Sequence, residues 1–270
     1  MNASRGPLLG IGREAEVFAW GDRQVLKLFP PNWPTAAVEY EARATCVAYS
    51  SGVNTPRVDE VIERDGRLGI IFERVDGPTM LHVVTTQPWH LWPFARSFAE
   101  LHFAVHQCTA PQLHSARRSV EGRIQNAPAL SADLKRAALR AWAQLPDGDR
   151  LCHGDLHPDQ IIVSPQGLVI IDWADALRGH PWADVARTSL ILRFSPLPPG
   201  TPLPMRLITH AFRRLFHSEY LRHYFQLSSA TKEPLAAWEA PLAAARLCEE
   251  IPGERERLLR LVGARLDDLA

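Results

Sequence analysis

Two acidic motifs separated by a short hairpin constrain the fold of this chain more than any other feature of its sequence. The first motif, HGDLHPDQ, spans residues 153–160, and the second, IDWAD, spans residues 171–175. The segments at 160–163 and 168–171 are apolar and are joined by the turn sequence SPQG, so they predict two short strands. A strand that ends at an acidic residue fixes the position of that side chain while leaving it open to a ligand.

The rest of the sequence divides into a strand-rich first third and a helix-rich remainder. After a glycine-containing loop, residues 17–29 predict two strands around a Gly-Asp turn, and residues 57–75 predict two more around an Asp-Gly turn. Residues 35–50 lack Gly and Pro and predict a helix. Helical patterns follow at 94–105, 134–145, 206–225, 234–250 and 254–269, with a proline-rich loop at 195–204.

These patterns predict an α+β fold of two lobes with a ligand-binding cleft between them. The N-terminal lobe, residues 1–76, is small and strand-rich, and the C-terminal lobe, residues 77–270, is larger and mainly helical. The chain has 270 residues, which is enough to bury a substantial core.

The composition excludes several partners and compartments. Lys and Arg together number 30, as do Asp and Glu, and the pI of about 7.2 favours neither nucleic acid nor an anionic membrane. The four cysteines form no CxxC pair, which indicates reduced thiols rather than a disulfide framework. With no signal peptide and no run of about 20 apolar residues, we expect a cytoplasmic protein of undetermined oligomeric state.

The paired motifs resemble the catalytic and metal-binding loops of the aminoglycoside phosphotransferase family, relatives of the protein kinases, whose own motifs are HRDxxxxN and DFG. The resemblance covers roughly residues 9–187 and continues to the C-terminus only as a helical pattern. It implies a protein-kinase-like bilobal fold and an ATP- and Mg²⁺-dependent kinase. The acceptor would be a hydroxyl of a small polar molecule: an aminoglycoside, another antibiotic, a sugar or an amino alcohol.

Asp155 is the catalytic residue that the resemblance implies, since phosphoryl transfer needs a carboxylate to orient the attacking hydroxyl and take its proton. Asp172 would be a magnesium ligand. Gln160 stands where the family usually has an asparagine that holds a second metal, and its extra methylene changes how the amide oxygen reaches the ion. The alternative is that Asp155 and Asp159 cap turns and that Asp172 is the N-cap of a following helix.

The N-terminal loop GIGREAEV, residues 10–17, is similar to the kinase glycine-rich loop, with alanine at the third glycine position. Gly10 and Gly12 would let backbone amides approach phosphates, and Val17 would lie over the adenine. Without the downstream motifs, a plain turn into a strand would be the preferred interpretation. Glu73 and Val75 resemble the interlobe hinge, whose backbone would contact the adenine edge, although an ordinary strand end explains them nearly as well.

Lys27 lies in the apolar strand segment VLKLF and needs an anionic partner there. The resemblance implies a nucleotide-contacting lysine paired with a helix glutamate, for which Glu39 and Glu41 are the candidates. They lie about 200° apart around a helix, so only one can face the lysine. Glu39 has Arg43 at i+4 for a solvated ion pair, which makes Glu41 the better choice.

Other acidic and histidine residues have structural interpretations. His153 and His157 have a zinc-like spacing, but Gly154 and Pro158 disfavour a helix there, so hydrogen bonds within the loop are favoured. Asp184 lies in a segment similar to the family element in which an aspartate braces the catalytic loop. Three acids of the C-terminal part would favour a cationic acceptor if they lined its pocket, although solvated helix faces explain them equally well: Glu239, Glu249 and Glu250.

Two other functional classes remain open at this point. A pseudokinase, which is a nucleotide-binding module without turnover, would account for Gln160 and Ala15. A protein kinase is disfavoured, because the short path from Asp172 to Asp184 leaves little room for an activation loop.

Overall fold

The computed structural model describes residues 5–12, 14–197, 200–228 and 235–266. These residues pack as two compact units. The first comprises the described residues up to Thr86 together with Pro158–Ala176, and the second comprises Gln87–His157 and the described residues from Leu177 onward. The hairpin between the two acidic motifs therefore packs with the N-terminal strands. None of the helices in these described ranges has the length and hydropathy needed to cross a membrane.

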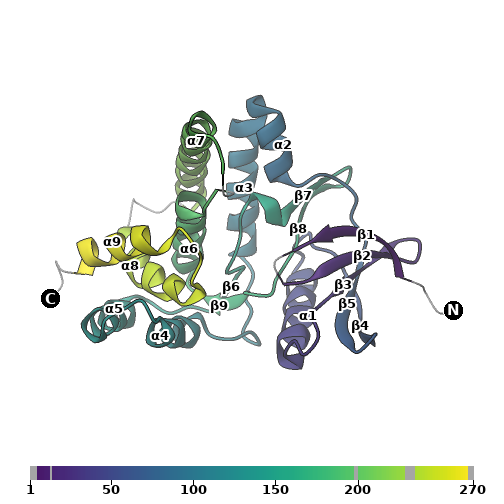
Figure 1. The fold of residues 1–270 in the computed structure, drawn as a ribbon, viewed down its shortest axis with the longest axis horizontal. Coiled ribbons are helices and arrows are strands. Elements are labelled where there is room, and N and C mark those ends of the chain that lie inside the picture. The colour runs from purple at the N-terminus through teal and green to yellow at the C-terminus, as the bar shows by residue number, and fades with distance from the viewer. Residues whose placement is uncertain (1–4, 13, 198–199, 229–234, 267–270) are drawn as a thin grey trace. The chain divides into compact units, whose positions relative to one another are not determined.

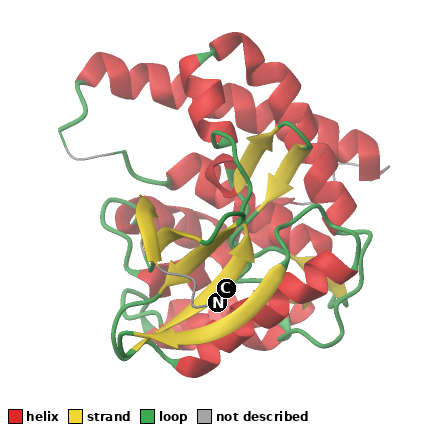
Figure 2. Ribbon diagram, turned by 90° about the vertical axis from the view of Figure 1, so that its right-hand side faces the viewer, coloured by secondary structure: helices red, strands yellow, loops and turns green. Residues whose placement is uncertain are grey.

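The first unit is built on a five-stranded antiparallel sheet with strand order β1-β2-β3-β5-β4, whose strands are among those drawn in yellow in Figure 2. The strands are β1 (Arg5–Ile11), β2 (Glu16–Trp20), β3 (Gln24–Leu28), β4 (Val58–Arg64) and β5 (Arg67–Glu73). Helix α1 (Thr35–Ser50) packs against β4 and β5 (Figure 1). Apolar side chains fill both faces of the sheet, and Phe29, Val38, Ala42 and Ile70 form the cluster on the side of α1.

The register of this sheet places one row of residues across four strands. Gly10 pairs with Val17, Val17 with Lys27, and Lys27 with Ile70. Directly opposed residues in an antiparallel sheet point to the same face. Because Ile70 packs toward α1, Lys27 and Val17 lie on the face that this helix covers.

A second hairpin, β7 (Ile161–Ser164) and β8 (Gly167–Ile170), follows the 3₁₀-helix η2 (Pro158–Gln160) and is held on both edges. On one edge, the N–H of Val163 donates to the carbonyl of Pro78, before α2 (Met80–Thr86). On the other edge, the Asn54 side chain donates to Leu168, and Ile170 donates to the Asn54 carbonyl. These bonds fix the segment that carries Gln160.

Helices form nearly all of the second unit. They are α3 (Leu91–Val105), α4 (Ala116–Asn126), α5 (Ala132–Gln144), α6 (Pro181–Phe194), α7 (Leu203–Ser228), α8 (Leu235–Arg246) and α9 (Arg255–Leu266). Two 3₁₀-helices, η1 (Pro88–His90) and η3 (Leu247–Glu249), and the strand pair β6 (Arg150–Cys152) and β9 (Leu177–Gly179) complete the unit.

Helix α8 is the centre of the main core of this unit. It packs against α4, α5, α6 and α9, and its alanines allow close approach on several sides at once. Helices α3 and α7 pack side by side and run in parallel, since successive residues of one helix meet successive residues of the other: Arg96 with Glu219, His102 with Tyr220, and His106 with Tyr224.

The structure confirms the predicted elements of the first unit, but β1 and α2 were not predicted. Helix α1 has the expected bounds, and the four expected strands correspond to β2, β3, β4 and β5. The expectation of only a loop before residue 16 was wrong, because Arg5–Ile11 forms β1. Gly6 and Pro7 weaken the strand pattern there, and the ladder to β2 accommodates them through register shifts.

In the second unit, the helical patterns correspond to α3, α5, α7, α8 with η3, and α9, and the expected helical residues 234 and 267–269 lie outside the described part. Helices α4 and α6 were not predicted.

Candidate functional site

Lys27, Glu41 and Asp172 meet in the first unit. The Nζ atom of Lys27 lies 2.7 Å from Oε1 of Glu41 and 3.0 Å from Oδ1 of Asp172. Strand β3 supplies the lysine, α1 the glutamate, and the segment after β8 the aspartate. The expected contact between Lys27 and Glu41 is confirmed, and Glu39 is exposed on the other side of α1.

Burial and charge act in opposite directions on Lys27. Burial disfavours the ammonium, but the carboxylates of Glu41 and Asp172 outweigh burial and hold the pKa of Lys27 above its ordinary value. The side chain of Glu41 is only 3% exposed, so the lysine satisfies a carboxylate that water hardly reaches. Lys27 therefore remains a cation at neutral pH.

Asp172 has a backbone conformation that few residues adopt. Its φ angle is 68°, in the left-handed region, which aspartate tolerates better than most side chains. Residues held in such conformations cluster at ligand-binding and catalytic sites. Its side chain is 37% exposed, so the carboxylate remains open to a ligand although it also contacts Lys27.

Gln160 lies beside Asp172, with its Nε2 atom 3.2 Å from Oδ2 of the aspartate. A carboxylate and an amide oxygen are the hard donors that Mg²⁺ prefers, so this pair fits a divalent cation. Gln160 would have to turn its amide so that the oxygen, rather than the nitrogen, faces the ion.

The glycine-rich loop connects β1 to β2. The N–H of Gly12 donates to the carbonyl of Ala15 at 2.8 Å, which closes the loop, and Arg13 lies outside the described residues. A Cβ at Gly10 would meet no atom within 4 Å, so open space lies beside this backbone. Gly10 and Val17 are partners in the ladder, and Val17 is the partner of Lys27.

Glu73 ends β5 and is exposed, whereas Val75 lies beyond the strand and is half-buried. The N–H of Glu73 donates to the carbonyl of Arg57 at 2.9 Å. Gly77 follows with a φ of 151°, and a Cβ there would approach the carbonyl oxygen of Val163 to 2.2 Å. Only glycine fits at this position, so its backbone contact with the hairpin fixes the path of residues 73–77.

Asp155 lies in the second unit, in the loop after β6. Gly154 precedes it with a φ of 81°, a conformation that glycine adopts without strain. Oδ1 of Asp155 lies 3.5 Å from Nη2 of Arg187, and Oδ2 lies 3.7 Å from Nε2 of His157. Burial alone would raise the pKa of Asp155, but His157 and Arg187 outweigh it and hold the pKa below its ordinary value, so the side chain is a carboxylate at neutral pH.

Asp184 of α6 holds the backbone just before Asp155. Its Oδ2 accepts the N–H of His153 at 2.6 Å, and its Oδ1 accepts the N–H of Gly154 at 2.9 Å. The expected brace is therefore present. The expected loop hydrogen bond of His153 is also present, since its Nδ1 accepts the N–H of Asp155 at 3.3 Å.

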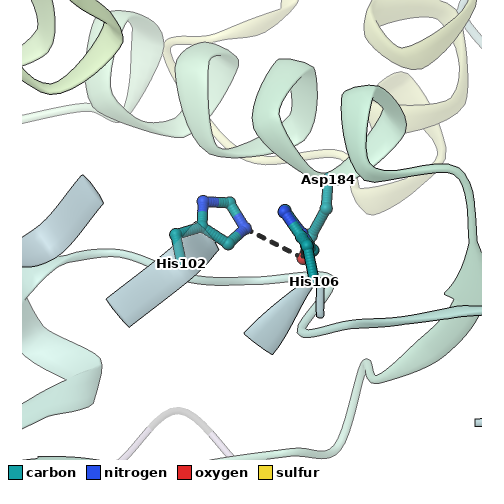
Figure 3. A group of neighbouring side chains, drawn as sticks. All are labelled: His102, His106 and Asp184. Carbon is teal, nitrogen blue, oxygen red and sulfur yellow. Dashed lines mark hydrogen bonds and ion pairs between the residues drawn. The ribbon is translucent and has the colours of Figure 1, made fainter. Parts of the chain in front are cut away.

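Two histidines of α3 complete the surroundings of Asp184 (Figure 3). Nε2 of His102 lies 3.0 Å, and Nε2 of His106 lies 3.2 Å, from Oδ2 of Asp184. Their Nδ1 atoms face the hydroxyls of Tyr220 and Tyr224 at 2.8 and 2.6 Å. All these groups are buried, and each has a partner.

This cluster could hold a metal by composition, since two imidazoles and a carboxylate converge. Hydrogen bonding favours a structural role. The pKa of Asp184 is held well below its ordinary value, because the two histidines outweigh the effect of burial. A carboxylate can only accept hydrogen bonds, so both Nε2 atoms carry hydrogens and offer no lone pair to a metal.

The buried His106 predicts a loss of stability in acid. Burial, and then the neighbouring His102, lower the pKa of His106 to about 4. Between about pH 4 and 6.5 the unfolded chain therefore binds more protons than the folded one, so the free energy of unfolding falls as the pH falls. His106 alone would cost about 2 kcal/mol at about pH 5.

Urea unfolding at about pH 7 and 5 measures this loss. His106→Gln should unfold more easily at neutral pH and lose less on acidification, while the exposed His82→Gln serves as the matched control. Equal acid sensitivity in wild type and His106→Gln would contradict the assignment.

The sequence did not single out Arg187, His102 or His106. Their only sequence signals are local: the two histidines are spaced i, i+4, and Arg187 follows Asp184 by one helical turn. Of the two interpretations given for Glu239 and Glu249, the solvated helix face was wrong, because each is largely buried and contacts an arginine of α6: Glu239 contacts Arg193, and Glu249 contacts Arg187.

Comparisons with known proteins agree with this geometry. The model of the phosphotransferase enzyme family matches residues 7–238. The comparison with curated proteins found no match for this chain.

Three solved structures share the fold. The crystal structure of an aminoglycoside-3'-phosphotransferase of type VIII is 17% identical, with a TM-score of 0.62 over 93% of this chain and 94% of that one. The amicoumacin kinase hAmiN, in complex with AMP-PNP, Ca²⁺ and Ami, is 15% identical, with a TM-score of 0.61 over 97% and 88%. A putative fructosamine-3-kinase from Haemophilus somnus 129PT is 12% identical, with a TM-score of 0.64 over 98% and 92%. These likenesses confirm the kinase-like α+β fold.

Proposed function

This chain belongs to the phosphotransferase enzyme family, and we propose that it transfers the γ-phosphoryl group of ATP to a hydroxyl of a small polar molecule, with Asp155 acting on that hydroxyl. The observation that carries this proposal is the meeting of Lys27, Glu41 and Asp172, which lie far apart in the sequence and form two ion pairs. We keep the functional division into a nucleotide-binding lobe, residues 1–76, and a catalytic and acceptor-binding lobe, residues 77–270.

In this proposal Lys27 contacts the nucleotide phosphates, and Glu41 holds the lysine in place. Asp172 and Gln160 would hold Mg²⁺, which supplies positive charge to the phosphates when bound. Gly10 and Gly12 leave room for backbone amides to approach the phosphates. Val17 would contact the base, and the backbone of Glu73 and Val75 would contact its edge. Glu73 would use its carbonyl there, because its N–H already donates to the carbonyl of Arg57.

Asp155 is proposed to accept a hydrogen bond from the acceptor hydroxyl and to take its proton. Its lowered pKa keeps it ionised at neutral pH, so it is ready to accept but is a weak base. Positioning is therefore its main contribution, which suits a reaction in which alignment and electrostatics supply most of the rate enhancement.

The acceptor is best sought in a broad panel. Glu239 and Glu249 are neutralised by arginines, so they give no reason to restrict the search to cationic acceptors. Coupled measurement of ADP release with Mg²⁺ should show turnover with at least one member of a panel of aminoglycosides, sugars and amino alcohols. Wild-type protein that binds ATP but gives no acceptor-stimulated turnover with any class would count against the proposal.

A pseudokinase remains the alternative, and Gln160 separates the two functions. If its amide oxygen reaches the metal, Gln160→Ala should raise the magnesium concentration needed for half-maximal turnover and lower the maximum. Gln160→Asn should preserve or improve activity, because the shorter side chain restores the usual family residue. The exposed Gln166→Ala, in the β7–β8 turn, is the matched control.

Calorimetry with and without magnesium gives the second readout for wild type and both Gln160 variants. If nucleotide affinity does not depend on magnesium and none of the three proteins hydrolyses ATP, the protein is a nucleotide-binding pseudokinase rather than an enzyme.

A further inference from the structure

Arg187 connects the loop of Asp155 to the C-terminal helices. Its guanidinium is almost fully buried, with the side chain 8% exposed, and it uses three nitrogens in three directions. Nε donates to the carbonyl of Gly154 at 3.0 Å, Nη2 lies 3.5 Å from Oδ1 of Asp155, and Nη1 lies 2.5 Å from Oε1 of Glu249. The planar fork of arginine suits such a divided set of contacts, which lysine cannot reproduce.

The stronger ion pair of Arg187 is with Glu249 rather than with Asp155. Glu249 lies on η3, and two further arginines contact it: Arg123 at 3.2 Å and Arg246 at 3.3 Å. Arg246 is in turn held by both carboxylate oxygens of Glu254, at 2.6 and 2.8 Å. Acidic and basic side chains therefore alternate along these contacts. The arginines fix the position of Glu249, and Glu249 in turn holds Arg187 away from a closer contact with Asp155.

Resting on the proposed role of Asp155, we propose that Arg187 is a positioning residue for the Asp155 carboxylate and that Glu249 sets how tightly Arg187 holds it. A close ion pair between Arg187 and Asp155 would occupy the carboxylate oxygen that must accept a hydrogen bond from the acceptor hydroxyl. Without Arg187, only the contact with His157, among the described residues, would restrain the carboxylate. Because Arg187 contacts both Asp155 and Glu249, it restrains the Asp155 carboxylate without forming a close ion pair with it.

The titratable and charged groups that face Asp155 come from two elements of the described structure. His153 and His157 belong to its own loop, and Arg187 belongs to α6. Glu249 on η3 acts on Asp155 only through Arg187. Removing Arg187 should therefore raise the pKa of Asp155, whereas removing the charge of Glu249 should let Arg187 move closer and lower it. Opposite directions cannot arise from a general loss of packing.

The experiment compares Arg187→Met and Glu249→Gln with a matched control, Glu239→Gln on α8. Glu239→Gln breaks the buried contact with Arg193, which is also on α6, and does not touch the Asp155 loop. Protein labelled with ¹³C at the aspartate carboxyls is titrated by NMR, and the Asp155 signal is assigned as the one missing from Asp155→Asn. Nucleotide affinity by calorimetry and turnover are measured on the same samples.

We expect the pKa of Asp155 to rise in Arg187→Met, to fall in Glu249→Gln and to stay unchanged in Glu239→Gln. Arg187→Met and Glu249→Gln should each lower kcat by about 10- to 100-fold with little change in nucleotide affinity. Arg187→Lys should restore the pKa of Asp155 but only part of kcat, because lysine returns the positive charge without the planar guanidinium that makes three contacts.

Shifts of the same direction in both variants, or a shift as large in Glu239→Gln, would overturn the positioning role. Full activity in Asp155→Asn would instead remove the proposed function of Asp155. The two failures are therefore distinguishable.

Discussion

Asp155→Asn is expected to lower turnover by about 100- to 10,000-fold while leaving nucleotide affinity within a few-fold of wild type. The amide has nearly the same shape as the carboxylate and keeps one oxygen, but without the negative charge it holds the acceptor hydroxyl more weakly and cannot take its proton. Since the proposed partner of Asp155 is the acceptor and not ATP, the defect should appear in kcat rather than in nucleotide binding. Steady-state kinetics with calorimetry on the same preparation separate the two.

Asp159→Asn is the matched control for this substitution, since Asp159 follows in the same motif but is exposed. Thermal unfolding of both variants checks that the loop held by Asp184 is intact. Near wild-type turnover in Asp155→Asn would remove this residue from the mechanism, and equal losses in both variants would point to the loop rather than to the carboxylate.

Local patterns were enough to predict much of the first unit. Helix α1 was predicted with its observed bounds because no Gly or Pro interrupts residues 35–50. The resemblance implied that Lys27 pairs with a glutamate of the next helix, and helical geometry, which puts Glu39 on another face, favoured Glu41. Strand β1 was missed because Gly6 and Pro7 hide its period of two, and only pairing with β2 defines it.

Contacts between distant helices could not be predicted in the same way. His102 and His106 meet Tyr220 and Tyr224 because α3 and α7 run in parallel, and nothing local to either segment encodes that arrangement. Arg187 and Glu249 likewise meet only once α6 and η3 pack in the same unit. For this reason the sequence offered only a pocket acid or a solvated acid for Glu249, since charge alone does not reveal a buried partner.

Lys27→Ala is expected to weaken ATP binding by at least about tenfold, which corresponds to about 1.4 kcal/mol of binding free energy. The substitution removes the proposed phosphate contact and both ion pairs of the lysine at once. It leaves the buried Glu41 without its cation, so some loss of folding stability should accompany the loss of affinity. Calorimetry corrected for the folded fraction measures the binding effect by itself.

Substitutions of the two glutamates of α1 test whether ATP affinity depends on the helix face that carries the charge or only on the local negative charge. Glu41→Ala should give a milder form of the Lys27→Ala defect, because the lysine keeps its contact with Asp172 but loses the partner that fixes its direction. Glu39→Ala removes the same charge two residues earlier, from an exposed position, and should change ATP affinity little. Unchanged affinity in Glu41→Ala would mean that Asp172 alone holds the lysine, whereas a larger defect in Glu39→Ala would contradict the pairing itself.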